Sequence, residues 1–484
     1  MKKAITKVVA VLLICVSIAV LISTLLANFV LTKEAPMSEE ERLAIQNFER
    51  ANYLKQSIYD NYYNDELTMV TKVPFPFKTE IWSTFGIMIP AIQASVWGYG
   101  SFLSMLYKFA LYESIVGEDL GAVAAYDNAL EGLMYYRKDG TDGKFLGYRH
   151  HRDLDKGGSN MNGISYDDDM WLARDILYMY ELTNDQKYLD YAVEIADYLL
   201  ECGAYIDLDP QIFIDFGIEG VTPETKIGGF YWDEELDMLH TCSNGPAIIF
   251  YSELYKYTNN EIYLNTAKKA YEFVLTLRSD DGVFYDCTEF NKMGANEIVG
   301  VKRIDKRKYT YNTGTPISGA VSLYETTGDE KYLNDAIDIA KSAREVLGAP
   351  VEDKDIVWYI NEGGYGGGAS AWFNSVLLNG YMDLLKYTDM TREYIEEFNK
   401  TLNWVYDTYL KAMDEDDKEA LFTKFALISP EANYIDKEYG KLIPAGRYVS
   451  GWAMEKYIDV DILNICGSVD MLISLAAYYA KQAE

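Results

Sequence analysis

Helical periodicity dominates the distribution of apolar and polar residues beyond residue 50. Apolar residues recur at intervals of three and four, which places them on one face of a helix. Short turns rich in Gly, Asn and Asp separate these amphipathic segments. Long runs in which apolar and polar residues alternate, as expected of half-buried strands, are scarce. The pattern therefore predicts an all-α chain built from helices joined by tight turns.

One helix–turn–helix pattern occurs three times, with the shared core T-[NG]-[DN]-x-x-Y-L-x-x-A. Its tyrosine is Tyr188, Tyr263 and Tyr332, so the copies are 75 and 69 residues apart. Each copy is predicted to contain the end of one helix, a tight turn and the start of the next, with Tyr, Leu and Ala on one face. Repeated hairpins bury such faces by stacking, either in an open solenoid or in a closed toroid.

Additional helices bring the number of hairpins close to six. Helix pairs are predicted at 92–113 with 118–137 and at 371–387 with 392–412, and a final helical segment at 460–481. We therefore predict an all-α (α/α)6 barrel, a toroid of six helical hairpins with the functional loops at one end. An open solenoid is the alternative.

The N-terminal region carries a candidate membrane segment. Residues 8–31 contain no charged side chain, and a helix of that length spans about 36 Å, more than the roughly 30 Å of a bilayer core. Lys2, Lys3 and Lys7 precede it, which favours an inside N-terminus and export of the remainder. We predict an uncleaved signal-anchor and the extracellular face of the cell membrane. If the segment is cleaved, the protein is secreted.

These predictions divide the chain into three parts. Residues 1–32 are the signal-anchor or transmembrane segment, and the charged stretch after it begins an N-terminal linker and helical extension, residues 33–90. Residues 91–484 form the (α/α)6 catalytic domain. We expect a monomer that is attached to the membrane through its N-terminal helix.

Composition narrows the chemistry. There are 44 Lys and Arg against 75 Asp and Glu, a formal charge of −31, which opposes binding to phosphate backbones and excludes nucleic acid as a partner. Three His and no CxxC pair give no support to a metal site and leave few candidates for His-dependent catalysis. We expect no cofactor, and carboxylates as the proton-transfer groups. The four cysteines beyond the anchor form disulfides or stay as buried thiols: Cys202, Cys242, Cys287 and Cys466.

The strongest candidate site is the acidic stretch Ser165-Tyr-Asp-Asp-Asp-Met-Trp171 at a predicted helix start. The structural interpretation is a helix start, because the stretch has the S-x-x-D form of a capping box and a first helical turn favours acidic side chains. As chemistry, neighbouring carboxylates raise one another's pKa, and a carboxyl pair is what glycoside hydrolysis requires. The 42 Tyr of the chain suit helix packing, and equally the faces and hydroxyls of sugars.

Two further stretches lie at equivalent hairpin positions. Gly228-Gly-Phe-Tyr-Trp232 is followed by Cys242-Ser-Asn-Gly-Pro246, and Tyr309-Thr-Tyr-Asn-Thr-Gly314 also precedes a helix. Each by itself is an ordinary turn with a helix cap, but the hairpin topology puts all of them at the end that holds the Asp cluster. His150 and His151 lie in a polar stretch that we interpret as a loop.

Taken together, these motifs resemble glycoside hydrolase family 76, the α-1,6-mannanases. The resemblance rests on YDDDMW (166–171), GGFYW (228–232), SNGP (243–246), YNTG (311–314) and GSVDML (467–472), and it covers roughly residues 90–480. It implies an (α/α)6 barrel and retaining hydrolysis of α-1,6-mannosidic bonds in a neutral polysaccharide, α-mannan. The family's transglycosidases and a non-catalytic glycan-binding surface protein are the alternatives.

The resemblance also implies roles for individual residues. Asp167 matches the nucleophile and Asp168 the acid/base, whereas Asp169 lies outside the catalytic pair. Residues in the same blocks are expected to bind sugar: Tyr166, Trp171, Trp232, Asn244, Tyr311 and Asn312. In place of a Lys-Gly and an Arg that the family usually has, this chain has Trp372-Phe-Asn-Ser375, which leaves the distal substrate contacts open.

Overall fold

The computed structural model describes residues 37–64, 69–70, 94–151, 163–293, 297–351, 354–362, 370–407, 435–436, 441–442 and 462–483. The predicted signal-anchor, residues 1–32, lies outside the described residues, as does 71–93 of the predicted linker and extension.

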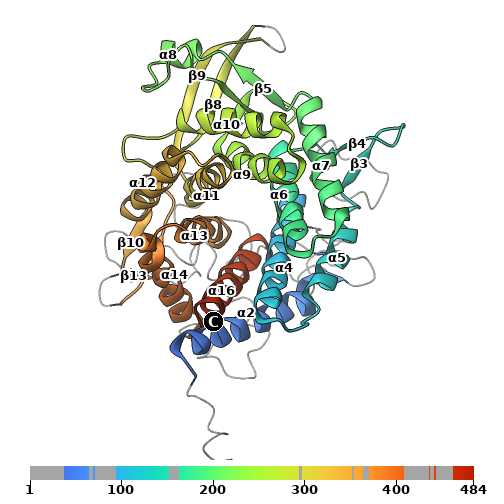
Figure 1. Ribbon diagram of the computed structural model, residues 1–484, viewed down its shortest axis with the longest axis vertical. Coiled ribbons are helices and arrows are strands. Elements are labelled where there is room, and N and C mark those ends of the chain that lie inside the picture. The colour runs from blue at the N-terminus through green and yellow to red at the C-terminus, as the bar shows by residue number, and fades with distance from the viewer. Residues whose placement is uncertain are drawn as a thin grey trace, which may run out of the picture.

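Six helices of the described residues form a closed inner ring (Figure 1). Each packs against the next, and the last packs against the first, which excludes the open solenoid. In ring order they are α4 (Val96–Val116), α6 (Tyr166–Thr183), α9 (Thr241–Thr258), α11 (Thr310–Thr327), α13 (Ala371–Leu385) and α16 (Ile462–Ala483).

A second helix backs each member of the ring from outside. Five of these follow their inner partners directly in the chain. The outer helices are α5 (Ala122–Leu133), α7 (Gln186–Glu201), α10 (Glu261–Leu275), α12 (Glu330–Leu347), α14 (Arg392–Val405) and α2 (Glu39–Tyr62). The chain is therefore all-α, as predicted, and the closed double ring is the arrangement of an (α/α)6 barrel.

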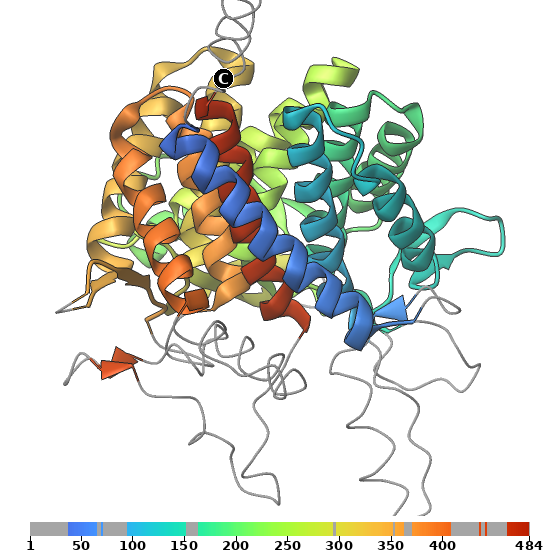
Figure 2. The ribbon, with the colours of Figure 1, turned by 90° about the horizontal axis from the view of Figure 1, so that it is seen from below.

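The sixth pair joins the two ends of the described chain. α2 runs along α16 (Figure 2) and occupies the outer position beside it. The sequence predicts that residues 39–62 belong to an extension before the barrel, but in the structure they form an outer helix of the barrel. The partners are about 400 residues apart in the chain, so no local turn pattern connects them.

α16 alone among the helices of the described part is long and apolar enough to cross a membrane by length and composition. However, 94% of its apolar window is buried inside the protein. An inner barrel helix is packed by neighbours on nearly all sides, and this requires the same all-round apolar composition. Its place in the ring thus accounts for its hydropathy.

The three sequence repeats form three equivalent turns, as predicted. In each, the last helical residue is a threonine whose hydroxyl donates to the carbonyl four residues earlier. The next residue is left-handed, with φ of 55°, 53° and 71°, which Asn and Gly tolerate best. The third residue caps the following helix through its side chain. The left-handed residues are Asn184, Asn259 and Gly328, and the caps are Asp185, Asn260 and Asp329.

The repeated tyrosines connect neighbouring outer helices. Tyr188 donates to Asp127 at 2.6 Å, from α7 to α5, and Tyr263 donates to Asp197 at 2.7 Å, from α10 to α7. The rings are buried while the hydroxyls reach carboxylates at the surface. Much of the Tyr content of this chain is thus used in helix packing.

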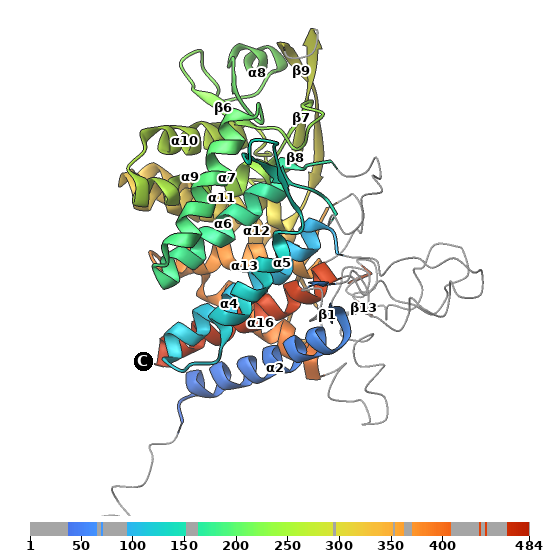
Figure 3. The same cartoon turned by 90° about the vertical axis from the view of Figure 1, so that its right-hand side faces the viewer.

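Short antiparallel sheets occur in the connections between helices (Figure 3). β7 and β9 lead directly into α9 and α11, so they position the first turns of these inner helices. The strands are β1 (Tyr63–Asn64), β2 (Met69–Val70), β3 (Arg137–Asp139), β4 (Phe145–Tyr148), β5 (Tyr205–Leu208), β6 (Ile227–Phe230), β7 (Met238–His240), β8 (Tyr285–Met293), β9 (Glu297–Lys308), β10 (Gly348–Pro350), β11 (Val357–Tyr359), β12 (Ile435–Asp436) and β13 (Lys441–Leu442). The short helices α8 (Gln211–Phe216) and η2 (Asp389–Thr391) complete the described elements.

The four cysteines of the described residues are free thiols. Cys202 is exposed, and Cys242, Cys287 and Cys466 are buried. The disulfide alternative from the sequence is therefore wrong for this structure. A core of this size needs no covalent crosslink to be stable.

Candidate active site

The acidic stretch forms the first turn of α6. Tyr166 begins the helix, and its N–H donates to the carbonyl of Trp232 at 2.8 Å. Ser165 makes no side-chain capping bond, so the capping-box interpretation is wrong. Its hydroxyl lies instead 3.4 Å from Nε2 of His150. The three carboxylates at this helix end are available for other contacts.

Asp167 is half-buried and accepts two hydrogen bonds. Its Oδ1 accepts the N–H of Asp168 at 2.9 Å, and its Oδ2 accepts from Sγ of Cys242 at 3.5 Å. Burial and the neighbouring charge of Asp168 raise the pKa of Asp167 to about 7. Burial also raises the pKa of the Cys242 thiol to about 12, so Cys242 stays a protonated donor.

Asp168 is buried, and its partner is a histidine. Nδ1 of His150 lies 3.7 Å from Oδ2 of Asp168. Burial raises the pKa of Asp168, and His150 opposes this rise. In return, the hydrogen bond with Asp168 raises the pKa of His150. Since both aspartates have raised pKa values, the pair can hold one proton near neutral pH.

Asp169 turns away from this pair and is fully buried. Its Oδ1 accepts the N–H of Tyr148 at 2.9 Å, and its Oδ2 has no hydrogen-bond partner among the described residues. Burial raises its pKa well above the usual range, which favours the neutral carboxyl. Asp169 thus fixes the strand end that leads to His150.

A second histidine lies on the other side of Asp167. His240 stacks obliquely on Trp232, with ring centroids 5.2 Å apart, and its Nδ1 lies 3.8 Å from Asp286. The charge of His240 lowers the pKa of Asp167. Asp286 also accepts from Arg307 at 3.1 Å and from the amide of Asn312 at 3.0 Å. These residues form a charged support beside the carboxyl pair.

By spacing alone, His240, Asp286 and Cys287 are close enough to ligate one metal ion. However, each carboxylate oxygen of Asp286 already has a partner, one of them the guanidinium of Arg307. A fixed cation at this position repels a metal ion, so we interpret the cluster as an electrostatic support.

The aromatic residues around the pair divide by exposure. Trp232 is half-buried and Trp97 is 39% exposed, so both have surface free for a ligand. Tyr311 is 9% exposed and stacks on Phe373, with centroids 4.1 Å apart. Trp171 is 7% exposed and its ring meets Trp372 at 4.9 Å. Trp372 and Phe373, the departure from the family pattern, therefore build an aromatic wall of the site.

Three predicted sugar contacts are placed differently. Tyr166 is buried, and its hydroxyl is beside Cys202 instead of the carboxyl pair. Asn244 is fully buried. Its side-chain oxygen accepts the N–H of Phe230, and its side-chain nitrogen donates to the carbonyl of the same residue. Asn312 is also fully buried, with its amide nitrogen on Asp286. These side chains hold the loops of the site in place.

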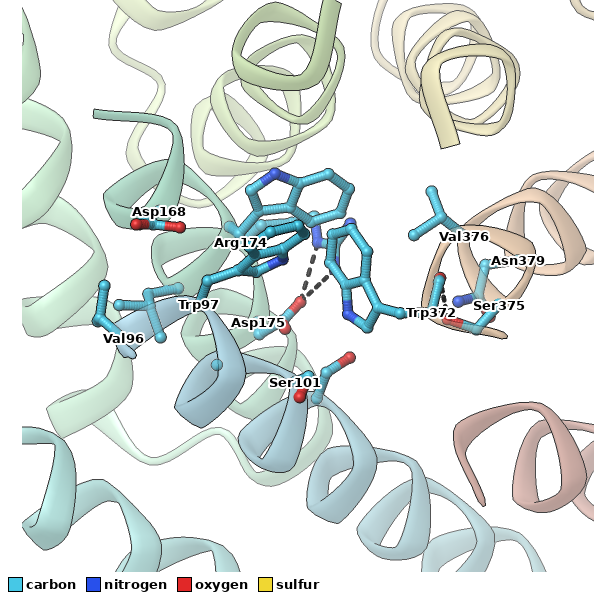
Figure 4. Close-up of a pocket in the computed structure, with 14 residues that line it drawn as sticks. Val96, Trp97, Ser101, Asp168, Arg174, Asp175, Trp372, Ser375, Val376 and Asn379 are labelled. Carbon is cyan, nitrogen blue, oxygen red and sulfur yellow. Dashed lines mark hydrogen bonds and ion pairs between the residues drawn. The ribbon is translucent and has the colours of Figure 1, made fainter. Parts of the chain in front are cut away.

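Below Asp168, a narrow pocket leads into the barrel (Figure 4). It measures about 20 Å³, enough for roughly one water molecule. Trp171 and Trp372 narrow it, and the ion pair between Arg174 and Asp175 at 2.6 Å lies beneath.

Several residues beside the pair are not recognisable from the sequence, and the reasons are physical. His150 belongs to a polar stretch without periodicity, and His240 and Cys242 lie in a strand-to-helix junction. The nearness of Asp286 depends on the pairing of β7 with β8, where His240 is opposite Cys287. Two of the three histidines lie beside the carboxyl pair, so imidazole groups contribute to the site although histidine is scarce in the chain.

Known proteins resemble this chain in sequence and in fold. Residues 164–363 match the sequence model of glycosyl hydrolase family 76. Mannan endo-1,6-α-mannosidase DCW1 of Eremothecium gossypii is 24% identical over 194 residues, 38% of this chain and 39% of the relative. The protein of that name from Saccharomyces cerevisiae is 27% identical over 103 residues, 21% of this chain and 22% of the relative. The chain thus aligns with well under half the length of these relatives.

Solved structures share the fold over most of the chain. The family 76 mannosidase Bt3792 from Bacteroides thetaiotaomicron has a TM-score of 0.64 and 22% identity, over 91% of this chain and 100% of its own. An inactive α-1,6-mannanase of Salegentibacter sp., with two consecutive aspartates replaced by alanine and α-1,6-mannotetrose bound, has a TM-score of 0.57 and 21% identity, over 89% of this chain and 98% of its own. This chain is therefore similar to glycosyl hydrolase family 76 in sequence over residues 164–363, and in fold over most of its length.

Proposed function

We propose that the protein is a glycosidase that cleaves α-1,6-mannosidic bonds in α-mannan with retention of configuration. The observation that carries the proposal is the carboxyl pair of Asp167 and Asp168, with raised pKa values, beside the aromatic side chains of a family 76 barrel. The names of the curated relatives and the inactive mannanase with two consecutive aspartates replaced support it.

In the proposed first step, Asp167 attacks the anomeric carbon while Asp168 protonates the departing oxygen. In the second step, Asp168 removes a proton from water, which hydrolyses the glycosyl–enzyme bond. His150 contacts Asp168 and accommodates its change of charge. Cys242 and His240 lie on the side of Asp167 and stabilise its ionised form.

The exposed aromatic faces give the substrate a stacking surface. Trp232 and Trp97 are the side chains that we propose to contact sugar rings, with Tyr311 and Trp171 behind them.

We also propose that an N-terminal anchor holds the barrel on the extracellular face of the membrane, and that the enzyme is a monomer. The formal charge of −31 favours a neutral polysaccharide as substrate.

The test is hydrolysis of unbranched α-1,6-mannan by the full-length protein, compared with Asp167→Asn and Asp168→Asn. We expect short manno-oligosaccharides from the wild type and a loss of roughly 10³-fold or more in each variant. Asp338→Asn, at the exposed surface of α12, is the matched control and should keep wild-type activity.

The anomer released first identifies the mechanism, because retention gives the α-product before mutarotation. A wild type that is inert on α-mannans contradicts the substrate. Transfer of mannosyl groups to an added sugar acceptor in preference to water identifies a transglycosidase. Variants of both aspartates with wild-type rates contradict the mechanism.

A further inference from the structure

We propose that the barrel has a second saccharide-binding site, at the end remote from Asp167 and Asp168. A cavity of about 560 Å³ is present there, within the range of roughly 300–1,000 Å³ that is typical of ligand pockets. Residues from the middle and the C-terminal ends of all six inner helices line it, whereas the carboxyl pair lies in the first turn of α6. The inference does not depend on the proposed reaction.

The two ends of the barrel are separated by an ion pair. Arg174 and Asp175 line both this cavity and the narrow pocket below Asp168 (Figure 4). Their contact at 2.6 Å is buried, and Arg174 also lies 4.4 Å over the ring of Trp171. Because the pocket between the ends admits only about one water molecule, a saccharide in the remote cavity occupies a site of its own.

The charged side chains of the cavity are largely paired with one another. Lys256 contacts Glu253 at 2.7 Å and Glu325 at 2.8 Å, and Lys386 contacts Asp383 at 3.4 Å. An ionic ligand would have to break these pairs and pay for the lost contacts. A neutral polyhydroxyl ligand can donate to the carboxylates and accept from the ammonium groups while the pairs stay intact. The wall therefore favours a neutral saccharide.

Aromatic side chains supply the apolar part of the site. Tyr107 and Tyr178 stack on each other, with centroids 5.4 Å apart and planes 25° apart, and both are only partly buried. Tyr257, 38% exposed, also lines the cavity. Aromatic rings with polar tips suit sugars, which have apolar ring faces and hydroxyls at their edges.

Polar groups that can form further hydrogen bonds face the same cavity. Ser474 is 4% exposed, and its hydroxyl has no hydrogen-bond partner among the described residues. Lys108 donates to the side-chain oxygen of Asn379 at 2.9 Å, and its charge acts on the buried carboxyl of Asp470. Burial and the charge of Glu253 raise the pKa of Glu181 to about 8, so its carboxyl is mostly neutral and can both donate and accept. A bound polyol would satisfy these groups.

The experiment counts binding sites. The full-length protein with Asp167→Asn and Asp168→Asn, which cannot consume the ligand, is titrated calorimetrically with α-1,6-mannotriose. We expect two classes of site. Tyr178→Ala and, independently, Lys108→Met should weaken one class at least tenfold and leave the other unchanged. Trp232→Ala should have the opposite selectivity. Melting temperature confirms that each variant is folded.

Three outcomes overturn the proposal. One is a single class of site that Trp232→Ala abolishes. Another is a second class that neither Tyr178→Ala nor Lys108→Met weakens. The third is binding of inorganic phosphate in a Lys108-dependent manner without binding of mannotriose, which identifies an anion site. Mannan hydrolysis is measured separately on the wild type, so a failure of the proposed reaction remains distinct from a failure of this site.

Discussion

Nδ1 of His150 lies 3.7 Å from Oδ2 of Asp168, and Nε2 of the same ring lies 3.4 Å from Oγ of Ser165. The imidazole thus connects the acid at the start of α6 with the residue before that helix. It is partly exposed, whereas the carboxyl is buried. A positive charge at this position counteracts the burial that raises the pKa of Asp168.

The first prediction concerns His150→Gln. The substitution removes the charge that lowers the pKa of Asp168, so this pKa should rise. The acid must be protonated to act, and therefore the alkaline limb of the kcat/KM profile should move to higher pH. His151→Gln, the neighbouring histidine, serves as the control and should leave that limb in place. An unchanged alkaline limb in His150→Gln would show that the imidazole does not act on Asp168.

The second prediction concerns Cys242. Its thiol donates to Oδ2 of Asp167 at 3.5 Å and so stabilises the ionised carboxylate. Cys242→Ala removes the donor, which should raise the pKa of Asp167. Because the nucleophile must be ionised, the acid limb of the pH–rate profile should move to higher pH, with a rate loss of roughly tenfold below pH 6. Cys242→Ser keeps a donor and should restore the limb. Equal profiles for the Ala and Ser variants would contradict this role.

The third prediction concerns the buried, neutral Asp169. Its folded-state pKa is raised, so the folded protein binds a proton that the unfolded chain releases above pH 4. The stability contributed by the protonated form is therefore lost as pH rises from about 4 towards the folded-state pKa. Asp169→Asn cannot ionise, and it should become more stable than wild type with increasing pH, by roughly 1–3 kcal/mol at pH 8.

Urea unfolding of the full-length protein at pH 5 and pH 8 measures this difference. Asp169→Ala leaves the N–H of Tyr148 without its acceptor and should be destabilised by about 1–3 kcal/mol at both pH values. The exposed Asp338→Asn should show neither effect. If Asp169→Asn loses stability at pH 8 relative to wild type, the carboxyl is ionised and the interpretation fails.

The repeats made the hairpins predictable because their information is local. Thr183, Asn184 and Asp185 determine a helix end, a left-handed residue and a helix cap within three positions, and the structure forms all three. The outer position of α2 was not predictable in this way. It depends on packing against α16, across nearly the whole chain. Closure of the barrel therefore lies beyond what local patterns contain.

The same difference between local and long-range information applies to the site. The adjacent aspartates could be identified because the chemistry is in consecutive residues. Asn244 fits a sugar-binding motif by sequence, but its amide is used by the backbone of Phe230. His150 and Asp286 reach the site through strand pairing and loop geometry, and these are tertiary features. The sequence thus predicts the proposed reacting groups more readily than the residues that support them.

The fourth prediction tests the close packing of two inner helices. A Cβ atom added at Gly467 of α16 would overlap the backbone of Trp372 on α13. Backbone cannot move away as a flexible side chain can, so Gly467→Ala should destabilise the protein by about 1–3 kcal/mol. Gly300→Ala, where nothing lies within 4 Å, is the matched control. A melting temperature of Gly467→Ala equal to that of the control would mean that α13 and α16 can move apart without loss of stability.

The last prediction assigns the two carboxyls their roles. The pKa of Asp167 is raised to about 7, yet a nucleophile must be ionised, so the assignment needs a chemical test. With an activated aryl α-mannoside and added azide, Asp167→Gly should give the β-azide, because azide attacks directly from the vacated face. Asp168→Gly should give the α-azide, because azide opens a glycosyl intermediate on Asp167. NMR of the product distinguishes the two anomers. The reverse pattern would exchange the roles, placing the nucleophile at Asp168, whose charge is held by His150.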